Sequence, residues 1–249
     1  MLSTLGKTGG LIGVNPGAEQ TDLARITVLS IDLDDTLWPI TPVIETANRI
    51  SWCWFAEHYP RVVECFKLED CGHFREQASR MHPECAHDLS RLRIISYELL
   101  LQAAGYDGRG AKAAFEVFFA ARNDVHPFSD VEPALQRLAG RFRLISLSNG
   151  NADLGRITLG RYFSASISAQ CAGIKKPHPA IFAATCQRAE VAPQQLLHIG
   201  DHPLEDVAGA IDYGIAAIWM NRQGQAWRYP QQPWMIAEDF QQVTDRLLE

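Results

Sequence analysis

The chain has 249 residues, of which 47% are hydrophobic and 21% charged, enough for one large domain or for a core with a smaller second module. Its formal net charge of −6 disfavours the basic surface that binding to a nucleic-acid backbone requires. Because it contains neither a run of about 18 apolar residues nor a signal-peptide pattern, we expect a cytoplasmic globular protein, monomeric or homodimeric, that binds neither nucleic acid nor membrane.

The six cysteines lie far apart and form no CxxC pair, which favours reduced thiols. His82, Cys85 and His87 are close together, but their spacing matches no standard zinc-ligand pattern. We therefore expect no zinc site there.

Residues 1–21 are rich in glycine, show no periodicity and are predicted to form a loose leader. An apolar strand then runs from Ile26 to Ile31 and ends in Asp32, Leu33 and Asp34. Its apolar residues indicate burial on both faces, as in a parallel sheet, and ligands gather at the carboxyl ends of such strands. In an extended chain side chains alternate with period two, so Asp32 and Asp34 are expected to face one site.

Four helical patterns follow without a strand between them. Thr41 and Pro42 predict the start of the first helix, which Pro60 ends, and the others lie at about 68–81, 86–104 and 110–122. From this pattern we expect two domains. A helical bundle over residues 42–124 is inserted into a core made of residues 22–41 and 125–249.

From about residue 125 short apolar strands alternate with helices. This rhythm predicts an α/β fold with a doubly wound parallel sheet, which the first strand joins. The expected helices lie near 130–139, at 152–159, from Pro177 onward and at 204–213, and the expected strands lie at 143–147, 165–169, 196–199 and 215–219.

Polar residues follow several of these strands. If the strands are parallel, they meet Asp32 at one edge of the sheet, where each close pair of carboxylates costs roughly 4 kcal/mol at 4 Å and an effective dielectric of about 20. Such a site needs cations, and Lys176 together with Mg²⁺ would supply them. The polar residues are Ser148, Asn149 and Gly150 after LISL, Lys176 in GIKKP, and Asp201 and Asp206 after LLHI.

This set of residues suits phosphoryl transfer on a small phosphorylated metabolite. Asp32 could attack phosphorus to form an aspartyl-phosphate, and Asp34 could serve as general acid and then general base. Lys176 would offset the negative charge of nucleophile and phosphate. The residues expected to bind the substrate are Thr36, Ser148, Asn149, Gly150 and Lys176.

At four places the chain resembles the haloacid-dehalogenase-like (HAD) hydrolase superfamily, over about residues 25–222. The matching segments are DLDDT, the serine of SLSNGN, the lysine of IKKPHPAIF, and GDHPLED. The resemblance implies a Rossmann-like core with a helical cap at about residues 42–124 and Asp32 as nucleophile with Asp34 as acid/base. It further implies that Asp32, the main-chain carbonyl of Asp34 and Asp201 bind magnesium, and that Asp206 orients the lysine or the metal's waters.

Three less specific segments, WPITPVIE, PECAHDLSRLRIISYELLLQAAG and SNGNADL with LGRYF, are similar to one bacterial branch of this superfamily. That branch contains phosphatases of flavin mononucleotide and of a phosphorylated pyrimidine in riboflavin synthesis. Glu205 departs from the branch, where asparagine often precedes the last acid.

Alternatives stay open at this point. The same fold supports 2-haloacid dehalogenation, which needs neither a second acid nor a metal, and a non-catalytic phosphate-binding protein is a further candidate; the long helical insert disfavours a receiver-type phospho-acceptor. Single residues also have plainer interpretations. Lys176 could be a solvated charge, Asp206 an ordinary first-turn acid, His202 a structural residue or a substrate contact, and Trp38 a residue of the substrate entrance or of the cap contact.

Overall fold

A computed structural model, in which residues 23–249 are described, contains one six-stranded sheet with the order β3-β2-β1-β4-β5-β6. All neighbouring strands are parallel, as predicted. The central strand β1 pairs with β2 and β4, so that Ile31 lies opposite Ser146 and Ile199 and the three carboxyl ends adjoin. The strands are β1 (Val28–Ile31), β2 (Arg143–Ser148), β3 (Ala165–Ser168), β4 (Leu196–Gly200), β5 (Ala216–Met220) and β6 (Met235–Ala237).

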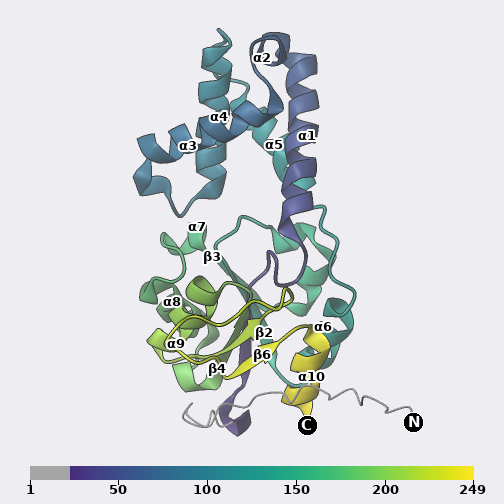
Figure 1. The fold of residues 1–249 in the computed structure, drawn as a ribbon, viewed down its shortest axis with the longest axis vertical. Helices are drawn as coiled ribbons and strands as arrows, with labels where there is room; N and C mark the ends of the chain where they lie inside the picture. Colours follow the sequence, from purple (N-terminus) through teal and green to yellow (C-terminus); the bar gives the residue numbers. More distant parts are fainter. Residues whose placement is uncertain (1–22) are drawn as a thin grey trace, which may run out of the picture.

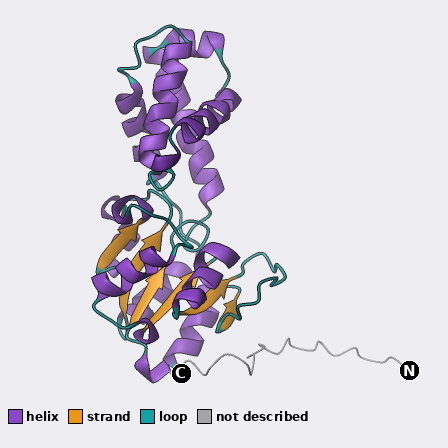
Figure 2. Ribbon diagram, turned by 90° about the vertical axis from the view of Figure 1, so that its left-hand side faces the viewer, coloured by secondary structure: helices purple, strands orange, loops and turns teal. Residues whose placement is uncertain are grey.

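Helices cover both faces of the sheet (Figure 2). On one face α6 (Val131–Ala139) and α10 (Phe240–Leu248) contribute to one apolar cluster with β1. On the other, α8 (Pro179–Ala189) and α9 (Gly209–Tyr213) contribute to a second, and the short helix α7 (Ala169–Ala172) follows β3. Every residue of β1 is buried, which confirms the strand predicted to be covered on both sides.

A bundle of helices is inserted between β1 and β2 and stands over the carboxyl edge of the sheet (Figure 1). It has its own apolar core, in which Phe55, Leu100 and Phe115 are buried. The insert agrees with the predicted helical module; the boundaries at residues 42 and 124 remain a prediction. Its helices are α1 (Ile40–His58), α2 (Pro60–Cys65), α3 (Cys71–Met81), α4 (Leu89–Ala103) and α5 (Ala111–Arg122).

Several predicted elements need correction. Helix α1 begins at Ile40, before Thr41, because the Asp35 carboxylate accepts a hydrogen bond from the Ile40 amide at 2.9 Å. The helix predicted at 152–159 is replaced by two short 3₁₀ turns. They bring the chain back so closely that a Cβ on Gly160 would lie 2.0 Å from the Leu154 carbonyl oxygen.

The helix predicted at 204–213 begins as a π-helical turn, Pro203–Ala208, and continues as α9. Helix α2, β6 and α10 were not predicted. The leader predicted at 1–21 lies outside the described residues. In residues 23–249, no helix combines the length and apolar character that a membrane span requires.

Candidate active site

The turn after β1 carries three of the predicted site residues. Because β1 ends at Ile31, Asp32 and Asp34 lie beyond the strand, where strict alternation of side chains no longer applies. The Asp32 amide donates to the Ile199 carbonyl at 2.9 Å, which fixes this residue against β4. At Asp35 the backbone adopts a φ of 58°, a left-handed conformation that reverses the chain. The Asp32 side chain is thereby held at the sheet edge with only 6% of the residue exposed.

Lys176 lies at the centre of the site. Its ammonium nitrogen is 2.6 Å from Asp32 Oδ1, 2.5 Å from Asp206 Oδ1 and 2.8 Å from the Leu147 carbonyl oxygen. These acceptors use all three of its protons. Since the residue is 1% exposed, its interpretation as a solvated surface charge is wrong.

The side chain of Asn149 holds the loop that carries Lys176. Asn149 Oδ1 accepts from the Lys176 amide at 2.8 Å, and its Nδ2 donates to the Lys176 carbonyl at 3.0 Å. The same Nδ2 donates to Glu205 Oε2 at 2.9 Å, so the unusual glutamate has a partner within the site. The Asn149 amide group is thus committed to protein contacts, and the predicted contact with substrate would have to come from its backbone.

Asp206 is anchored by a histidine that the motifs did not identify. His198 Nε2 lies 3.1 Å from Asp206 Oδ1, and its Nδ1 lies 2.8 Å from the Ser30 hydroxyl. Burial lowers the pKa of His198 despite the nearby Asp206 carboxylate, so we assign a neutral ring that donates to Asp206 and accepts from Ser30. The sequence feature that could have identified this residue is the presence of a histidine in the otherwise apolar segment LLHI.

The backbone around Asp206 completes this arrangement. The His202 amide donates to Asp206 Oδ2 at 2.9 Å, and His202 Nδ1 accepts from the backbone amides of Leu204 and Glu205. These contacts agree with the structural interpretation of His202. A Cβ on Gly200 would lie 2.3 Å from Asp206 Cγ, so only glycine allows the carboxylate to come this close.

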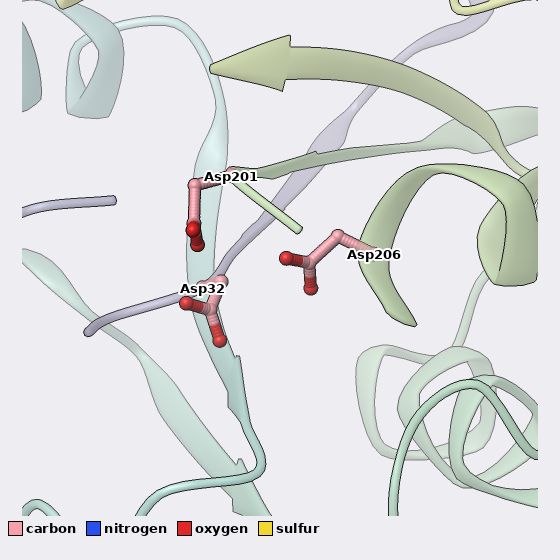
Figure 3. A group of neighbouring side chains, drawn as sticks. All are labelled: Asp32, Asp201 and Asp206. Carbon is pink, nitrogen blue, oxygen red and sulfur yellow. The ribbon is translucent and has the colours of Figure 1, made fainter. Parts of the chain in front are cut away.

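Asp201 joins the group through Thr36. The fully buried Thr36 hydroxyl lies 3.1 Å from Asp201 Oδ1 and 3.4 Å from Asp32 Oδ2. Carboxylate oxygens of Asp32, Asp201 and Asp206 lie within 4.8 Å of one another. Figure 3 shows the three neighbouring side chains. The predicted convergence of acids from β1, from β4 and from the turn after β4 is therefore present.

The electrostatics of the three acids differ. Burial raises the pKa of Asp32 well above its usual range, against the effect of Lys176 and with that of Asp206 and Asp201. Burial, with the Asp206 charge, also raises the pKa of Asp201 to about 7. Burial opposes ionisation of Asp206 too, but Lys176 and His198 more than offset it and hold its pKa below the usual range.

The negative charge at Asp32 and Asp201 is thus incompletely compensated by the protein. A hard divalent cation bound by oxygen ligands would compensate it, and the spacing of these carboxylates fits such an ion.

Asp34 lies on the side of the insert. Arg122, the last residue of α5, places Nη2 2.7 Å from Asp34 Oδ1 and 2.5 Å from Oδ2. Trp38 Nε1 donates to Asp34 Oδ1 at 2.9 Å. Trp38 is 0% exposed and belongs to the apolar cluster that contains β1, so its predicted position at the substrate entrance is wrong, whereas packing against the cap stays a prediction.

Ser148 and Gly150 lie beside Asp34. Ser148 is buried, and its hydroxyl accepts a hydrogen bond from the Gly150 amide at 3.0 Å. A Cβ on Gly150 would lie 2.3 Å from Asp34 Oδ2 and 3.2 Å from Ser148 Oγ. The loop after β2 therefore approaches Asp34 as closely as a backbone can, with Ser148 at the same point.

A sequence profile described as haloacid dehalogenase-like hydrolase matches residues 26–214, most of the chain. The chain belongs to this hydrolase family. The profile ends before β5, so β5, β6 and α10 lie outside the match.

Named relatives of the HAD-like chain include phosphatases. It is 32% identical over 202 residues to the 5-amino-6-(5-phospho-D-ribitylamino)uracil phosphatase YigB of Escherichia coli, covering 80% of this chain and 84% of that protein. It is 33% identical over 222 residues to the phosphoserine phosphatase of Thermus thermophilus, covering 78% and 88%. The predicted resemblance to the riboflavin-pathway branch is confirmed.

A solved structure of a 2-haloacid dehalogenase from Pseudomonas syringae pv. Tomato DC3000 is also similar. It is 36% identical, superposes with a TM-score of 0.83, and the match covers 90% of this chain and 98% of that one. Both kinds of hydrolase are therefore represented among the relatives.

Proposed function

We propose that the protein is a magnesium-dependent phosphatase that hydrolyses a small phosphomonoester through an aspartyl-phosphate. The observation that carries this proposal is Asp32, held at 2.6 Å by the buried ammonium of Lys176 and accompanied by two further acids within 4.8 Å. A fourth carboxylate, Asp34, lies at the same sheet edge beside the Ser148 loop. The named phosphatase relatives support the same reaction type.

In the first step an Asp32 carboxylate oxygen attacks phosphorus, and the bond between phosphorus and the ester oxygen breaks. The electron pair of that bond stays on the leaving oxygen, which takes a proton from Asp34. In the second step water attacks phosphorus and gives a proton to Asp34. The bond between phosphorus and Asp32 then breaks, which restores the Asp32 carboxylate and releases inorganic phosphate.

The other site residues have supporting roles in this scheme. Lys176 neutralises part of the charge of Asp32 and keeps its Oδ1 fixed, so that Oδ2 faces the substrate. The Ser148 hydroxyl and the backbone amides near Gly150 bind phosphoryl oxygens. Asp206 acts through Lys176, because it contacts the lysine at 2.5 Å and is itself fixed by His198 and the His202 amide.

Mg²⁺, bound through Asp32, Asp201 and the Asp34 carbonyl, would supply positive charge that draws the phosphate to the nucleophile. The incompletely compensated acids described above support this assignment. The Thr36 hydroxyl lies within hydrogen-bonding distance of both Asp32 and Asp201 and, by donating its proton to one of these carboxylates, would help to hold them at the site.

For the substrate we propose a small phosphorylated metabolite of the kind named for YigB, a ribityl-substituted uracil phosphate or a related flavin phosphate. The helical insert over the site provides the surface that would select it. A panel of phosphate esters with flavin mononucleotide, sugar phosphates and phosphoserine would rank the substrates by kcat/KM.

Dehalogenation is the second candidate, because the similar solved structure is named as a 2-haloacid dehalogenase. In that reaction the Asp32 carboxylate would attack carbon and halide would leave with the bonding electrons. A halide needs no proton on leaving, so Asp34 would have no role as a general acid. The reaction also needs no cation, so Asp201 would have no role as a metal ligand. Release of chloride from 2-chloropropionate in the presence of a chelator would support this candidate over the phosphatase.

The decisive experiment is hydrolysis of p-nitrophenyl phosphate with Mg²⁺ by the protein and by its Asp32→Asn variant. We expect turnover by the unmodified protein and background rates for the variant, because an amide cannot form the acyl-phosphate. Turnover by Asp32→Asn equal to that of the unmodified protein would exclude the mechanism. A circular dichroism spectrum confirms that the variant is folded.

A further inference from the structure

Arg122 is a buried cation that connects the helical insert to the site. It is the last residue of α5 and 1% exposed. Its Nη2 contacts both oxygens of Asp34, at 2.7 and 2.5 Å, and its Nε donates to Asn151 Oδ1 at 3.0 Å. Asp34 is the one acid that forms a salt bridge with it among the described residues.

A purely structural role explains this arrangement poorly. Burying a guanidinium is costly, and apolar side chains of similar volume often replace buried ion pairs without loss of stability. Packing therefore does not require an arginine here. Moreover, Arg122 Nη1 is buried and has no hydrogen-bond partner in residues 23–249, a further cost that a structural contact would avoid. A buried arginine at this position is explained if the Asp34 carboxylate must be held in one orientation.

The surrounding contacts determine that orientation. Trp38 Nε1 and Arg122 Nη2 both donate to Asp34 Oδ1, whereas among the described residues Oδ2 accepts a hydrogen bond from Arg122 alone. The point where a Gly150 Cβ would lie is 2.3 Å from Asp34 Oδ2, 3.2 Å from Ser148 Oγ and 3.3 Å from Arg122 Nη2. Oδ2 is thus the oxygen held beside the proposed phosphate-binding loop.

The contacts continue to a second helix of the insert. Asn151, which anchors Arg122, also donates through Nδ2 to the Ser90 hydroxyl at 3.2 Å, at the start of α4. Residues from the turn after β1, from α5, from the loop after β2 and from α4 therefore form one hydrogen-bonded series. The position of the insert is in this way coupled to the Asp34 carboxylate.

We propose that Arg122 is a positioning residue that, anchored by Asn151, holds Asp34 for proton transfer to the leaving oxygen. The inference rests on the proposed phosphatase function and adds a residue that none of the four motifs contains. When the bond between phosphorus and the ester oxygen breaks, the oxygen keeps the electron pair and takes the Asp34 proton. A displaced Asp34 would hinder this transfer most when the leaving oxygen is strongly basic.

The test compares phenyl phosphate with p-nitrophenyl phosphate, two esters of similar shape whose leaving oxygens differ in basicity. For Arg122→Gln we expect kcat/KM for phenyl phosphate to fall roughly 100-fold, as expected for a misplaced catalytic group, and that for p-nitrophenyl phosphate less than about tenfold. Equal losses for both esters, or no loss, would overturn the inference. A general loss of structure would lower both alike.

Asn151→Ala provides a second variant that removes the hydrogen bonds of Asn151 to Arg122 and to Ser90 and leaves the buried ion pair in place. It decides the question if Arg122→Gln does not fold. We expect the same preference for the better leaving group, with a smaller loss, and the absence of any such preference would contradict the proposal. Arg161→Gln, which removes an exposed arginine paired with Glu132 far from Asp34, should leave both rates unchanged.

The same measurement separates the two hypotheses. If the unmodified protein hydrolyses neither ester with Mg²⁺, the phosphatase proposal fails and the role of Arg122 fails with it. If the unmodified protein is active and the variants show no dependence on the leaving group, the role of Arg122 alone is wrong.

Discussion

At the scale of single residues, Asp206 holds several groups of the site in place through its hydrogen bonds. Its carboxylate accepts hydrogen bonds from Lys176, His198 and the His202 amide, and it is 1% exposed. Replacing it by asparagine would leave the buried Lys176 ammonium with Asp32 as its one carboxylate partner among the described residues. Breaking a buried ion pair in this way is strongly unfavourable.

We therefore expect Asp206→Asn to lower the free energy of unfolding by about 3 kcal/mol. Urea denaturation of metal-free protein at neutral pH would measure the change. Glu238→Gln, a substitution of an exposed acid outside the site, is the matched control and should change stability by less than about 0.5 kcal/mol. A similar small change for Asp206→Asn would contradict the ion-pair interpretation.

At the scale of secondary-structure elements, Asp130 connects two helices on the same face of the sheet. It immediately precedes α6, and its carboxylate accepts from Arg222 Nη2 at 2.8 Å and from the amide of Phe240, the first residue of α10, at 2.7 Å. Burial alone would raise the pKa of Asp130, but these hydrogen bonds offset it and the pKa lies below its ordinary value.

A lowered pKa in the folded state means that this carboxylate stabilises the protein above about pH 4, and that the contribution is lost as pH falls through the folded-state value. We expect Asp130→Asn to be less stable than the unmodified protein at pH 7. The gap should narrow at about pH 3.5, where the unfolded chain takes up a proton on this carboxyl more readily than the native protein does. Denaturation curves at both pH values test this, and a gap independent of pH would be inconsistent with it.

The elements also differ in how far the sequence could predict them. The strands that precede the site consist of apolar runs, and each ends in the polar residues that identified Asp32, Ser148 and Asp201. By contrast, β6 has three residues and is followed at once by α10, too short a run for periodicity to detect.

Tertiary contacts decided other cases. The helix expected at 152–159 is replaced by 3₁₀ turns because the Asp153 amide donates to Asn123 Oδ1, a residue distant in sequence, while the Asp153 carboxylate accepts from the Gly155 amide. Arg122 and His198 escaped notice for the same reason. Each lies in an element whose pattern is apolar, and their acidic partners, Asp34 and Asp206, are identified by the fold and not by spacing alone.

At the scale of the whole molecule, bound Mg²⁺ should stabilise the folded chain, because the site that binds it exists only after β1 and β4 have paired. At 100 times the dissociation constant the gain is about 2.7 kcal/mol, which corresponds to a rise in the unfolding midpoint of about 5–10 °C. Differential scanning fluorimetry with Mg²⁺ and with a chelator measures it.

Asp201→Asn is the informative variant for this prediction. It removes one of the crowded carboxylates, so we expect a higher midpoint than that of the unmodified protein when metal is absent, and no further rise when Mg²⁺ is added. A full response to Mg²⁺ by this variant would show that the ion binds elsewhere.

The two ends of the helical insert leave the sheet side by side. The Leu37 carbonyl, just before α1, accepts a hydrogen bond from the Phe128 amide, just after α5, at 3.0 Å. Because the two ends of the insert adjoin, we expect that residues of the insert can be gained, lost or replaced without disturbing the pairing of the strands. Grafting the corresponding helices of a relative between these two points, with Arg122 kept at the end of α5, should therefore transfer substrate preference while leaving the reaction itself in place.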